Sequence, residues 1–274
     1  MTALVAYLMS ILQKTPTVRK NKYDLPLPDT CHLDLGEDVV GGRAVFVVGD
    51  VHGCLEELQD MIQVVKKMEA KVLFLFVGDL INRGPSSIGV LRLIQSGEID
   101  CYAVRGNHEE IVLKEYRFMK NDPNYVLRTK HKWIKDMTTQ DHHFLSQLPF
   151  TIGIPSLNSI VVHAGIVPGL SLDKQSLVAL TRMRNIIEED YFDGGGLVFS
   201  NKPDRGVPWS SLWPGPQHVY FGHDARRGFR QYDFATCLDT GCQYGNKLTG
   251  IFINGCQKLV SVKARRVYCV GKPE

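Results

Sequence analysis

The chain has 274 residues, 44% of them hydrophobic and 22% charged, which is ordinary for a globular protein. This length is near the upper limit of one domain, so we expect one main folding unit. A formal net charge of +3 is too small for a protein that coats nucleic acid, although anionic small molecules remain suitable ligands. No apolar run reaches the length of a membrane span, and no obligate protein partner is indicated.

The seven cysteines contain no C-x-x-C pair, which is typical of reduced thiols in an intracellular protein, so we expect a cytoplasmic location. Residues 3–12 are apolar, basic residues follow them, and no acidic residue precedes Asp24. A secretory signal carries its positive charge ahead of the apolar run, so none is predicted. A short surface helix is the favoured interpretation of this segment, and a mitochondrial presequence is the alternative.

Prolines and glycines within residues 13–43 predict a connecting segment. We therefore expect residues 1–43 to be an N-terminal extension and residues 44–274 a single domain. Five short apolar runs in that domain are rich in β-branched or aromatic residues and predict strands. They are Ala44–Val48, Val72–Val77, Cys101–Val104, Ser159–Val162 and His218–Phe221.

Helical patterns separate the first three of these strands. Cys54–Met68 is amphipathic, and Ser86–Gln95 begins after Pro85 with serines suited to an N-cap. Alternation of strand and helix predicts a βαβαβ unit with parallel pairing, hence an α/β fold. Two further stretches, 109–148 and 171–192, are predicted to be mostly helical.

Each predicted strand leads into a loop that carries potential metal ligands. These loops are Gly49-Asp50-Val51-His52-Gly53, Gly78-Asp79-Leu80-Ile81-Asn82-Arg83-Gly84-Pro85, Arg105-Gly106-Asn107-His108-Glu109, His163-Ala164-Gly165 and Gly222-His223-Asp224. The loops at the carboxyl ends of parallel strands form the ligand crevice of such a sheet. Two Asp, one Asn and four His are therefore expected to meet at one edge.

Oxygen and imidazole ligands without thiolate suit Mn, Fe, Co or Zn better than Ca or a pure Mg site. Seven such side chains exceed what one tetrahedral ion needs, whereas two ions that share a bridging carboxylate would use most of them. Any one of these motifs alone would be an ordinary turn. Five in order, each behind a strand, predict a dinuclear hydrolytic site.

The ordered motifs G-D-x-H-G, G-D-x-x-x-R-G-P, G-N-H-E, H-A-G and G-H resemble those of the calcineurin-like metallophosphatases over residues 44–270. Asn82 stands where the protein phosphatases of that family carry a second aspartate. Three later blocks resemble the symmetrical diadenosine tetraphosphate hydrolases. They are Thr181-Arg182-Met183-Arg184, Pro208-Trp209 leading to Pro214-Gly215-Pro216, and Leu238-Asp239-Thr240-Gly241-Cys242. The fold implied is a βαβαβ core within a two-sheet α+β sandwich flanked by helices.

The resemblance also implies roles for individual residues. The implied metal ligands are Asp50, His52, Asp79, Asn107, His163 and His223. Asp79 would bridge two ions. Asp50 and His52 would complete the first ion's ligands, and Asn107, His163 and His223 would complete those of the second. His108 would donate a proton to the leaving group, and Arg83 would contact phosphate oxygens.

The substrate-binding residues are less clearly indicated. Arg182 and Arg184 are two positions apart, which on a helix means about 200°. Either they lie on an irregular stretch, or only one of them binds phosphate. Trp209, Trp213 and Tyr244 have two interpretations, stacking on a base or packing in the core.

Three functions follow from these observations. The favoured one is hydrolysis of phosphoanhydrides, foremost the symmetrical cleavage of diadenosine tetraphosphate to two ADP by a water activated by two divalent ions. Mn²⁺ is the expected metal, with Fe, Co or Zn as alternatives. RNA caps or polyphosphate remain alternative substrates on the same site. A Ser/Thr protein phosphatase is disfavoured by Asn82, and a non-enzymatic scaffold would be expected to lack ligands that are present here.

Overall fold

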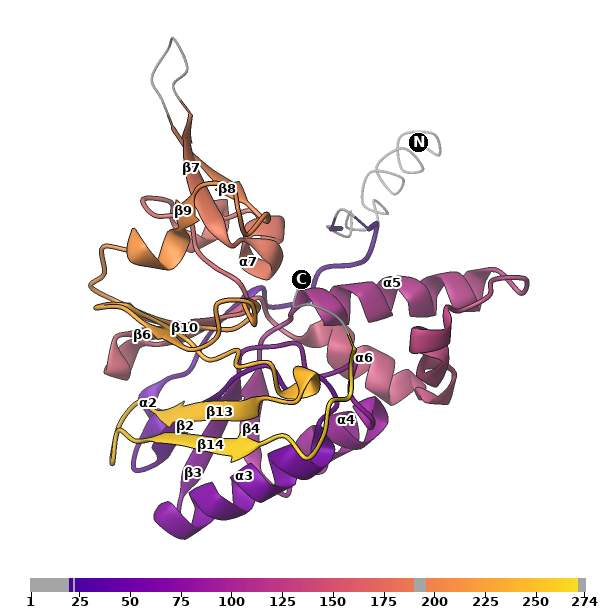
Figure 1. Ribbon diagram of the computed structural model, residues 1–274, viewed down its shortest axis with the longest axis horizontal. Helices are drawn as coiled ribbons and strands as arrows, with labels where there is room; N and C mark the ends of the chain where they lie inside the picture. Colours follow the sequence, from indigo (N-terminus) through magenta and orange to yellow (C-terminus); the bar gives the residue numbers. More distant parts are fainter. Residues whose placement is uncertain (1–19, 22, 190–195, 271–274) are drawn as a thin grey trace, which may run out of the picture.

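The computed structural model describes residues 20–21, 23–189 and 196–270, in which two β-sheets face each other (Figure 1). The first sheet contains, in spatial order, β14 (Leu259–Lys263), β13 (Lys247–Phe252), β2 (Ala44–Val48), β3 (Val72–Phe76) and β4 (Asp100–Ala103). The second contains β1 (His32–Asp34), β5 (Thr151–Ile154), β6 (Ser159–Val162), β10 (His218–Phe221), β12 (Ala235–Cys237) and β11 (Arg230–Gln231). The apolar segment 3–12 lies outside the described residues.

The five predicted strands are confirmed. Three have the predicted bounds, β3 ends one residue early, and β4 is shifted by one residue. Parallel pairing of β2 with β3 and of β3 with β4 is also confirmed. Helices α3 (Leu55–Met68) and α4 (Ser87–Gln95) connect these strands, as the βαβαβ pattern predicts.

β3 is buried on both faces, which explains its unbroken apolar sequence. Leu73 and Leu75 point into the core between the two sheets. Phe74 and Phe76 point the other way, into the core beneath the helices. This alternation with period two lets one strand serve both hydrophobic layers, and Figure 1 shows α3 and α4 covering the outer face.

Residues 109–148 are mostly helical, as predicted. They form α5 (Asn107–Asn121), η1 (Thr129–Asp136) and α6 (Thr139–Gln147). α6 begins at a capping box, in which Thr138 Oγ1 accepts from the Asp141 amide and Asp141 Oδ2 accepts from the Thr138 amide.

The helical prediction for residues 171–192 is wrong beyond Arg182. A short η3 (Leu172–Lys174) and α7 (Leu177–Arg182) are followed by the strand β7 (Asn185–Glu189). β7 pairs antiparallel with β8 (Gly196–Ser200) and with β9 (Val207–Pro208), forming a third sheet. β8 and β9 are the next strands along the chain, and β7 is stabilised by pairing with them, which the periodicity of its own residues does not reveal.

The predicted connecting segment contains structure of its own. β1 pairs in parallel with β5, and α2 (Glu37–Val40) follows it. Leu35 and Val40 are buried in the core between the sheets. A strand of three residues is too short to show alternation, which is why it was missed. The domain boundary at residue 44 stays a prediction.

The strands after β10 were also not predicted. β13 completes the first sheet by pairing antiparallel with β2, and β14 pairs with β13. Phe252 of β13 lies with its ring centroid 4.7 Å from that of Phe46, so the C-terminal hairpin closes the core above α3. Among the described residues, no helix is both long and apolar enough to cross a membrane.

Candidate active site

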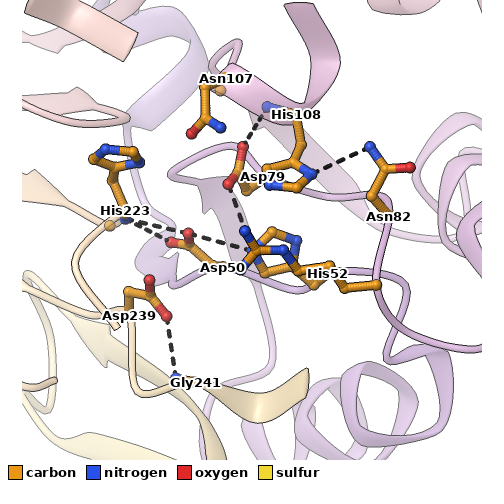
Figure 2. Close-up of polar contacts among 12 residues, drawn as sticks. Asp50, His52, Asp79, Asn82, Asn107, His108, His223, Asp239 and Gly241 are labelled. Atoms are coloured by element: carbon orange, nitrogen blue, oxygen red, sulfur yellow. Dashed lines mark hydrogen bonds and ion pairs between the residues drawn. The ribbon is translucent and has the colours of Figure 1, made fainter. Parts of the chain in front are cut away.

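The loops that follow β2, β3, β4 and β10 converge on one small cavity at the seam between the two sheets. Its lining consists of Asp50, His52, Asp79, Arg83, Asn107, His108, Arg184, His223, Ala225 and Asp239. Figure 2 shows the labelled side chains pointing toward one another from separate loops. His163, at the end of β6, lies against this group, with Nε2 3.0 Å from Asn107 Oδ1.

Hydrogen bonds to backbone carbonyls define the tautomers of two histidines. His52 Nδ1 lies 3.1 Å from the Ile81 carbonyl oxygen, and His163 Nδ1 lies 2.9 Å from that of Val77. A carbonyl only accepts, so each Nδ1 carries the proton. Each neutral ring therefore presents its Nε2 lone pair to the cavity, which is the usual arrangement of a metal-ligating histidine.

Both lone pairs face the same carboxylate. His52 Nε2 lies 3.5 Å from Asp79 Oδ2, and His163 Nε2 lies 3.4 Å from Asp79 Oδ1. Burial lowers the pKa of His163 to about 4 and holds the pKa of His52 well below its usual value, so neither ring is charged at neutral pH. Lone pairs that face carboxylate oxygens repel them unless positive charge lies between, so this geometry suits a cation on each side of Asp79.

The buried carboxylates of Asp79 and Asp50 have raised pKa values, so their charged forms are not fully stabilised by the protein alone. Burial raises the pKa of Asp79 to about 7, and burial followed by the charges of Asp239 and Asp79 raises that of Asp50 well above its usual value. Asp50 accepts from the backbone amide of His223 at 3.1 and 3.2 Å (Figure 2). The ring atom His223 Nε2 is buried and has no hydrogen-bond partner. An unpartnered imidazole nitrogen beside buried carboxylates fits a divalent cation.

Two sets of three side chains bring ligand atoms within 4.8 Å of one another, and both contain Asp79. One set adds His163 and His223, as expected for the second ion. The other adds His52 and His108, so His108 is closer to the first group than expected. Asp50 lies next to it, with Oδ2 4.0 Å from His52 Nε2.

His108 owes its orientation to two residues outside the cavity lining. Trp133 Nε1 donates to Asn82 Oδ1 at 3.0 Å. An indole can only donate, so the Asn82 Nδ2 group must face His108 Nδ1, 3.2 Å away. Nδ1 is then the acceptor, and the proton of neutral His108 lies on Nε2. Burial, with the neighbouring His52 imidazole and the positive charge of Arg83, keeps the pKa of His108 well below its usual value.

The model of the calcineurin-like phosphoesterase family matches residues 44–237, which is most of the chain. The chain belongs to this family. It is accordingly a phosphohydrolase of a family that works with divalent metal ions, and the two candidate ligand groups around Asp79 agree with that membership.

Individual relatives carry more specific names. A symmetrical bis(5'-nucleosyl)-tetraphosphatase of Coxiella burnetii is 29% identical, with 76% of this chain and 88% of the relative covered. An asymmetrical bis(5'-nucleosyl)-tetraphosphatase of Bacillus subtilis is also 29% identical, with 76% and 89% covered. A crystal structure provisionally named a diadenosine tetraphosphatase superposes with a TM-score of 0.73 at 34% identity and covers 86% of this chain and 98% of its own.

Arg182 and Arg184 lie on an irregular stretch of the chain. This is the first of the two alternatives considered for these arginines. α7 ends at Arg182, and Met183 is extended (φ −64°, ψ 139°). Arg184 lines the cavity and donates from Nη2 to the His223 carbonyl at 3.1 Å. Arg182 donates to the Tyr23 hydroxyl at 3.0 Å, and the charges of both arginines lower the pKa of Asp79. Both side chains therefore act on the site electrostatically, while phosphate binding by either stays a prediction.

The aromatic residues divide between the two interpretations. Trp209 is almost fully buried and donates from Nε1 to the Ala164 carbonyl at 2.9 Å, so it belongs to the core. Trp213 packs against the same core. Tyr244, by contrast, accepts a hydrogen bond from Arg83 Nη1, and its ring centroid lies 5.6 Å from the Arg83 guanidinium. Tyr244 therefore orients a residue that lines the cavity.

Backbone conformation at the site was not foreseen. His52, Asp79 and His223 have φ values of 47°, 48° and 69°, in the left-handed region that non-glycine residues avoid. Each such residue costs about 1–3 kcal/mol. The neighbouring Gly222 is needed for a different reason, because a Cβ there would overlap Asp50 Oδ1. The loops are thus strained in order to aim their ligands, as is common at active sites.

Two functional residues were missed at the sequence level. Asp239 lines the cavity beside Asp50, and burial raises its pKa to about 7. Its signal was present, since it lies in the L-D-T-G block. Glu109 of the G-N-H-E motif is fully buried and accepts from three backbone amides, those of Leu80 at 2.9 Å, Asp79 at 2.9 Å and Gly106 at 2.8 Å. It ties the loop after β3 to the loop after β4.

Replacing Glu109 with glutamine should lower the free energy of unfolding by about 1–3 kcal/mol, because an amide –NH₂ would face backbone N–H donors that then lack an acceptor. Urea denaturation of the metal-stripped protein measures this effect. Glu56→Gln, on the exposed face of α3, is the matched control and should change the free energy by less than about 0.5 kcal/mol. Equal effects of the two substitutions would show that Glu109 does not hold the loops together.

Proposed function

We propose that this chain hydrolyses phosphoanhydride bonds of nucleotides with two divalent metal ions, and that diadenosine tetraphosphate, cleaved symmetrically to two ADP, is its leading substrate. The observation that carries the proposal is the position of Asp79. Its two carboxylate oxygens face the Nε2 lone pairs of His52 and His163 at 3.5 and 3.4 Å. A carboxylate approached in this way from two sides suits a bridging ligand between two ions.

Asp50 and His52 would hold one ion together with Asp79. Asn107, His163 and His223 would hold the other, where His163 Nε2 and Asn107 Oδ1 already lie 3.0 Å apart. The mixture of oxygen and imidazole ligands favours Mn²⁺, with Fe, Co or Zn as alternatives. Divalent ions in such a site would act as Lewis acids, and they would lower the pKa of a bound water so that a nucleophile is available at neutral pH.

The remaining side chains position and polarise the substrate. His108 is neutral and carries its proton on Nε2, so it would donate a hydrogen bond to an oxygen of the leaving phosphate. Arg83, held by Tyr244, presents its guanidinium to the same cavity and would pair with phosphate oxygens. Arg184 and Arg182 add positive charge near the phosphate chain of a long substrate.

The names of the relatives support a dinucleoside polyphosphate as substrate. They do not separate the two cleavage modes, because a symmetrical and an asymmetrical enzyme are each 29% identical to this chain. The blocks at 181–184 and 238–242 favour the symmetrical mode by resemblance. RNA caps, polyphosphate and phosphopeptides are the competing substrates for the same site.

Metal dependence is the first test. Removal of metal ions with a chelator should abolish activity, and Mn²⁺ should restore it better than Ca²⁺. Asp79→Asn should lose both ions, whereas His223→Ala should mainly weaken the second, because only Asp79 belongs to both ligand groups. Elemental analysis of each variant measures the metal content. Full activity with less than one ion per chain would overturn the proposed mechanism.

The products of diadenosine tetraphosphate identify the bond that is attacked. ADP alone is expected, since water would attack a phosphorus atom at the centre of the chain. Chromatography of the nucleotides at early times, with ATP and ADP controls for secondary hydrolysis, measures the product ratio. Equal amounts of AMP and ATP would mean that the substrate binds one phosphate out of register and that cleavage is asymmetrical.

Asn82 offers a test of substrate class. Its amide donates to His108 Nδ1 and so disfavours the imidazolium form. A serine or threonine alkoxide needs a proton to leave, whereas a nucleoside diphosphate is a much weaker base. Asn82→Asp should therefore raise kcat/KM on a phosphopeptide relative to diadenosine tetraphosphate by about tenfold, the effect of one pKa unit.

Asn82→Ala is the matched control for that substitution. It removes the amide donor to His108 without adding a negative charge, so any shift of the activity ratio toward the phosphopeptide should be well below that of Asn82→Asp. Both variants are compared at equal metal occupancy. An unchanged ratio for Asn82→Asp would mean that position 82 does not determine the preference for anhydrides.

A further inference from the structure

A third group of potential metal ligands, apart from the two around Asp79, lies behind the catalytic loops. It consists of Cys54, Glu57 and Cys242, whose ligand atoms all lie within 4.8 Å of one another. All three side chains are 0% exposed. None of them lines the active-site cavity, so this cluster is a separate feature of the described structure.

The cluster joins two segments that matter for the active site. Cys54 follows His52 by two residues and caps the start of α3, which also carries Glu57. Cys242 follows Asp239 by three residues and begins η5 (Cys242–Tyr244), which ends at the partner of Arg83. A bond among these side chains would tie the loop after β2 to the loop after β12.

Glu57 is arranged as a metal ligand would be. Its Oε1 accepts from the Arg265 backbone amide at 2.9 Å and from the Tyr268 hydroxyl at 2.7 Å. These two bonds orient the carboxylate through Oε1. Oε2 is buried and has no hydrogen-bond partner. A buried carboxylate oxygen without a partner is costly, and a bound cation would remove that cost.

The two thiols contact each other through a side-chain hydrogen bond. That bond, together with burial, raises the pKa of the Cys242 thiol and so disfavours the thiolate form that oxidants attack. A disulfide switch is therefore disfavoured. Gln243, the next residue, is also fully buried, and both polar atoms of its side chain lack partners. This region therefore contains several buried polar atoms that have no hydrogen-bond partner within the protein.

We propose that Cys54, Glu57 and Cys242 bind a structural divalent ion of the thiophilic, zinc-like class. Two sulfur ligands and one carboxylate oxygen supply three of the four positions around a tetrahedral ion. With metal–sulfur bonds of about 2.3 Å, the two sulfurs would lie about 3.8 Å apart, which small rotations of the side chains would achieve. The site has no access for substrate, so the ion would brace the His52 and Asp239 loops and take no part in hydrolysis.

The proposal has a direct spectroscopic test. Thiolate bound to Co²⁺ or Cd²⁺ gives a charge-transfer absorption in the near ultraviolet, whereas the proposed active-site ligands are carboxylate, amide and imidazole groups. The full-length protein is reduced, stripped of metal and titrated with Cd²⁺ and, separately, with Co²⁺. The expected result is a thiolate band that saturates at one ion per chain, in addition to the ions bound without a band.

Variants assign the band to this cluster. The double variant Cys54→Ser/Cys242→Ser should lose it, and Glu57→Gln should weaken the affinity of the band-forming ion at least about tenfold. Cys237→Ser is the matched control, because Cys237 is another buried cysteine, hydrogen-bonded to the Gly222 carbonyl at 3.7 Å, and does not belong to the cluster. The control should keep the band and its stoichiometry.

Three outcomes would overturn the proposal. They are absence of the band from the wild-type protein at saturating metal, persistence of the band in the double variant, and a Cys54–Cys242 disulfide mapped in protein purified under reducing conditions. The first and third are measured on the wild-type chain, so they remain decisive even if a variant fails to fold. Loss of the band would leave the proposed hydrolysis untouched, because that function rests on Asp79 and its own ligands.

Discussion

The carboxylate of Asp79, buried between two imidazole lone pairs, is the contact on which the active site depends. Its Oδ1 also accepts from the His108 amide at 2.9 Å. A Cβ at Gly106 would overlap Asp79 Oδ1. The glycine of the G-N-H-E motif is therefore needed to leave space for this carboxylate, and not because a turn requires a glycine there. Glu109 fixes the Asp79 backbone from behind. One side chain therefore links the loops after β3, β4 and β6. The proposed cations on either side of it would satisfy buried atoms, such as His223 Nε2, that lack partners in the protein.

This arrangement stores unfavourable energy in the fold. Left-handed backbone at His52, Asp79 and His223, together with like-charged carboxylates at Asp50 and Asp239, opposes folding in the absence of metal ions. The opposing stability comes from the layers beneath, where β2 and β3 are buried between α3 and the second sheet. A well-packed support of this kind allows strained loops to persist, because the loops cannot relax without disturbing the core.

The Asn82–His108 pair is the contact on which the proposed preference for anhydrides over phosphoesters rests. The orientation of the Asn82 amide is determined by Trp133, which lies on η1 about fifty residues after Asn82 in the chain. Since the indole only donates, it orients the amide of Asn82, and the amide in turn defines the tautomer of His108. The orientation of His108 therefore depends on Trp133, a residue outside the cavity lining.

The sequence by itself determined the strands β2, β3, β6 and β10 and the ligand types at their ends, because fully buried strands leave unbroken apolar runs and the loops behind them carry glycines. The sequence also indicated the family, because the five ligand-bearing motifs occur in the order typical of it. Only the tertiary structure decided the short strand β1, the strand β7 in place of a predicted helix, and the hairpin of β13 and β14. It alone brought Trp133 to Asn82 and Glu57 to Cys242. Some of these features join residues far apart in the chain, such as the pairings of β1 with β5 and of β13 with β2, and others are hairpins between consecutive strands. The periodicity of one segment carries no information about the partner with which it pairs, near or far.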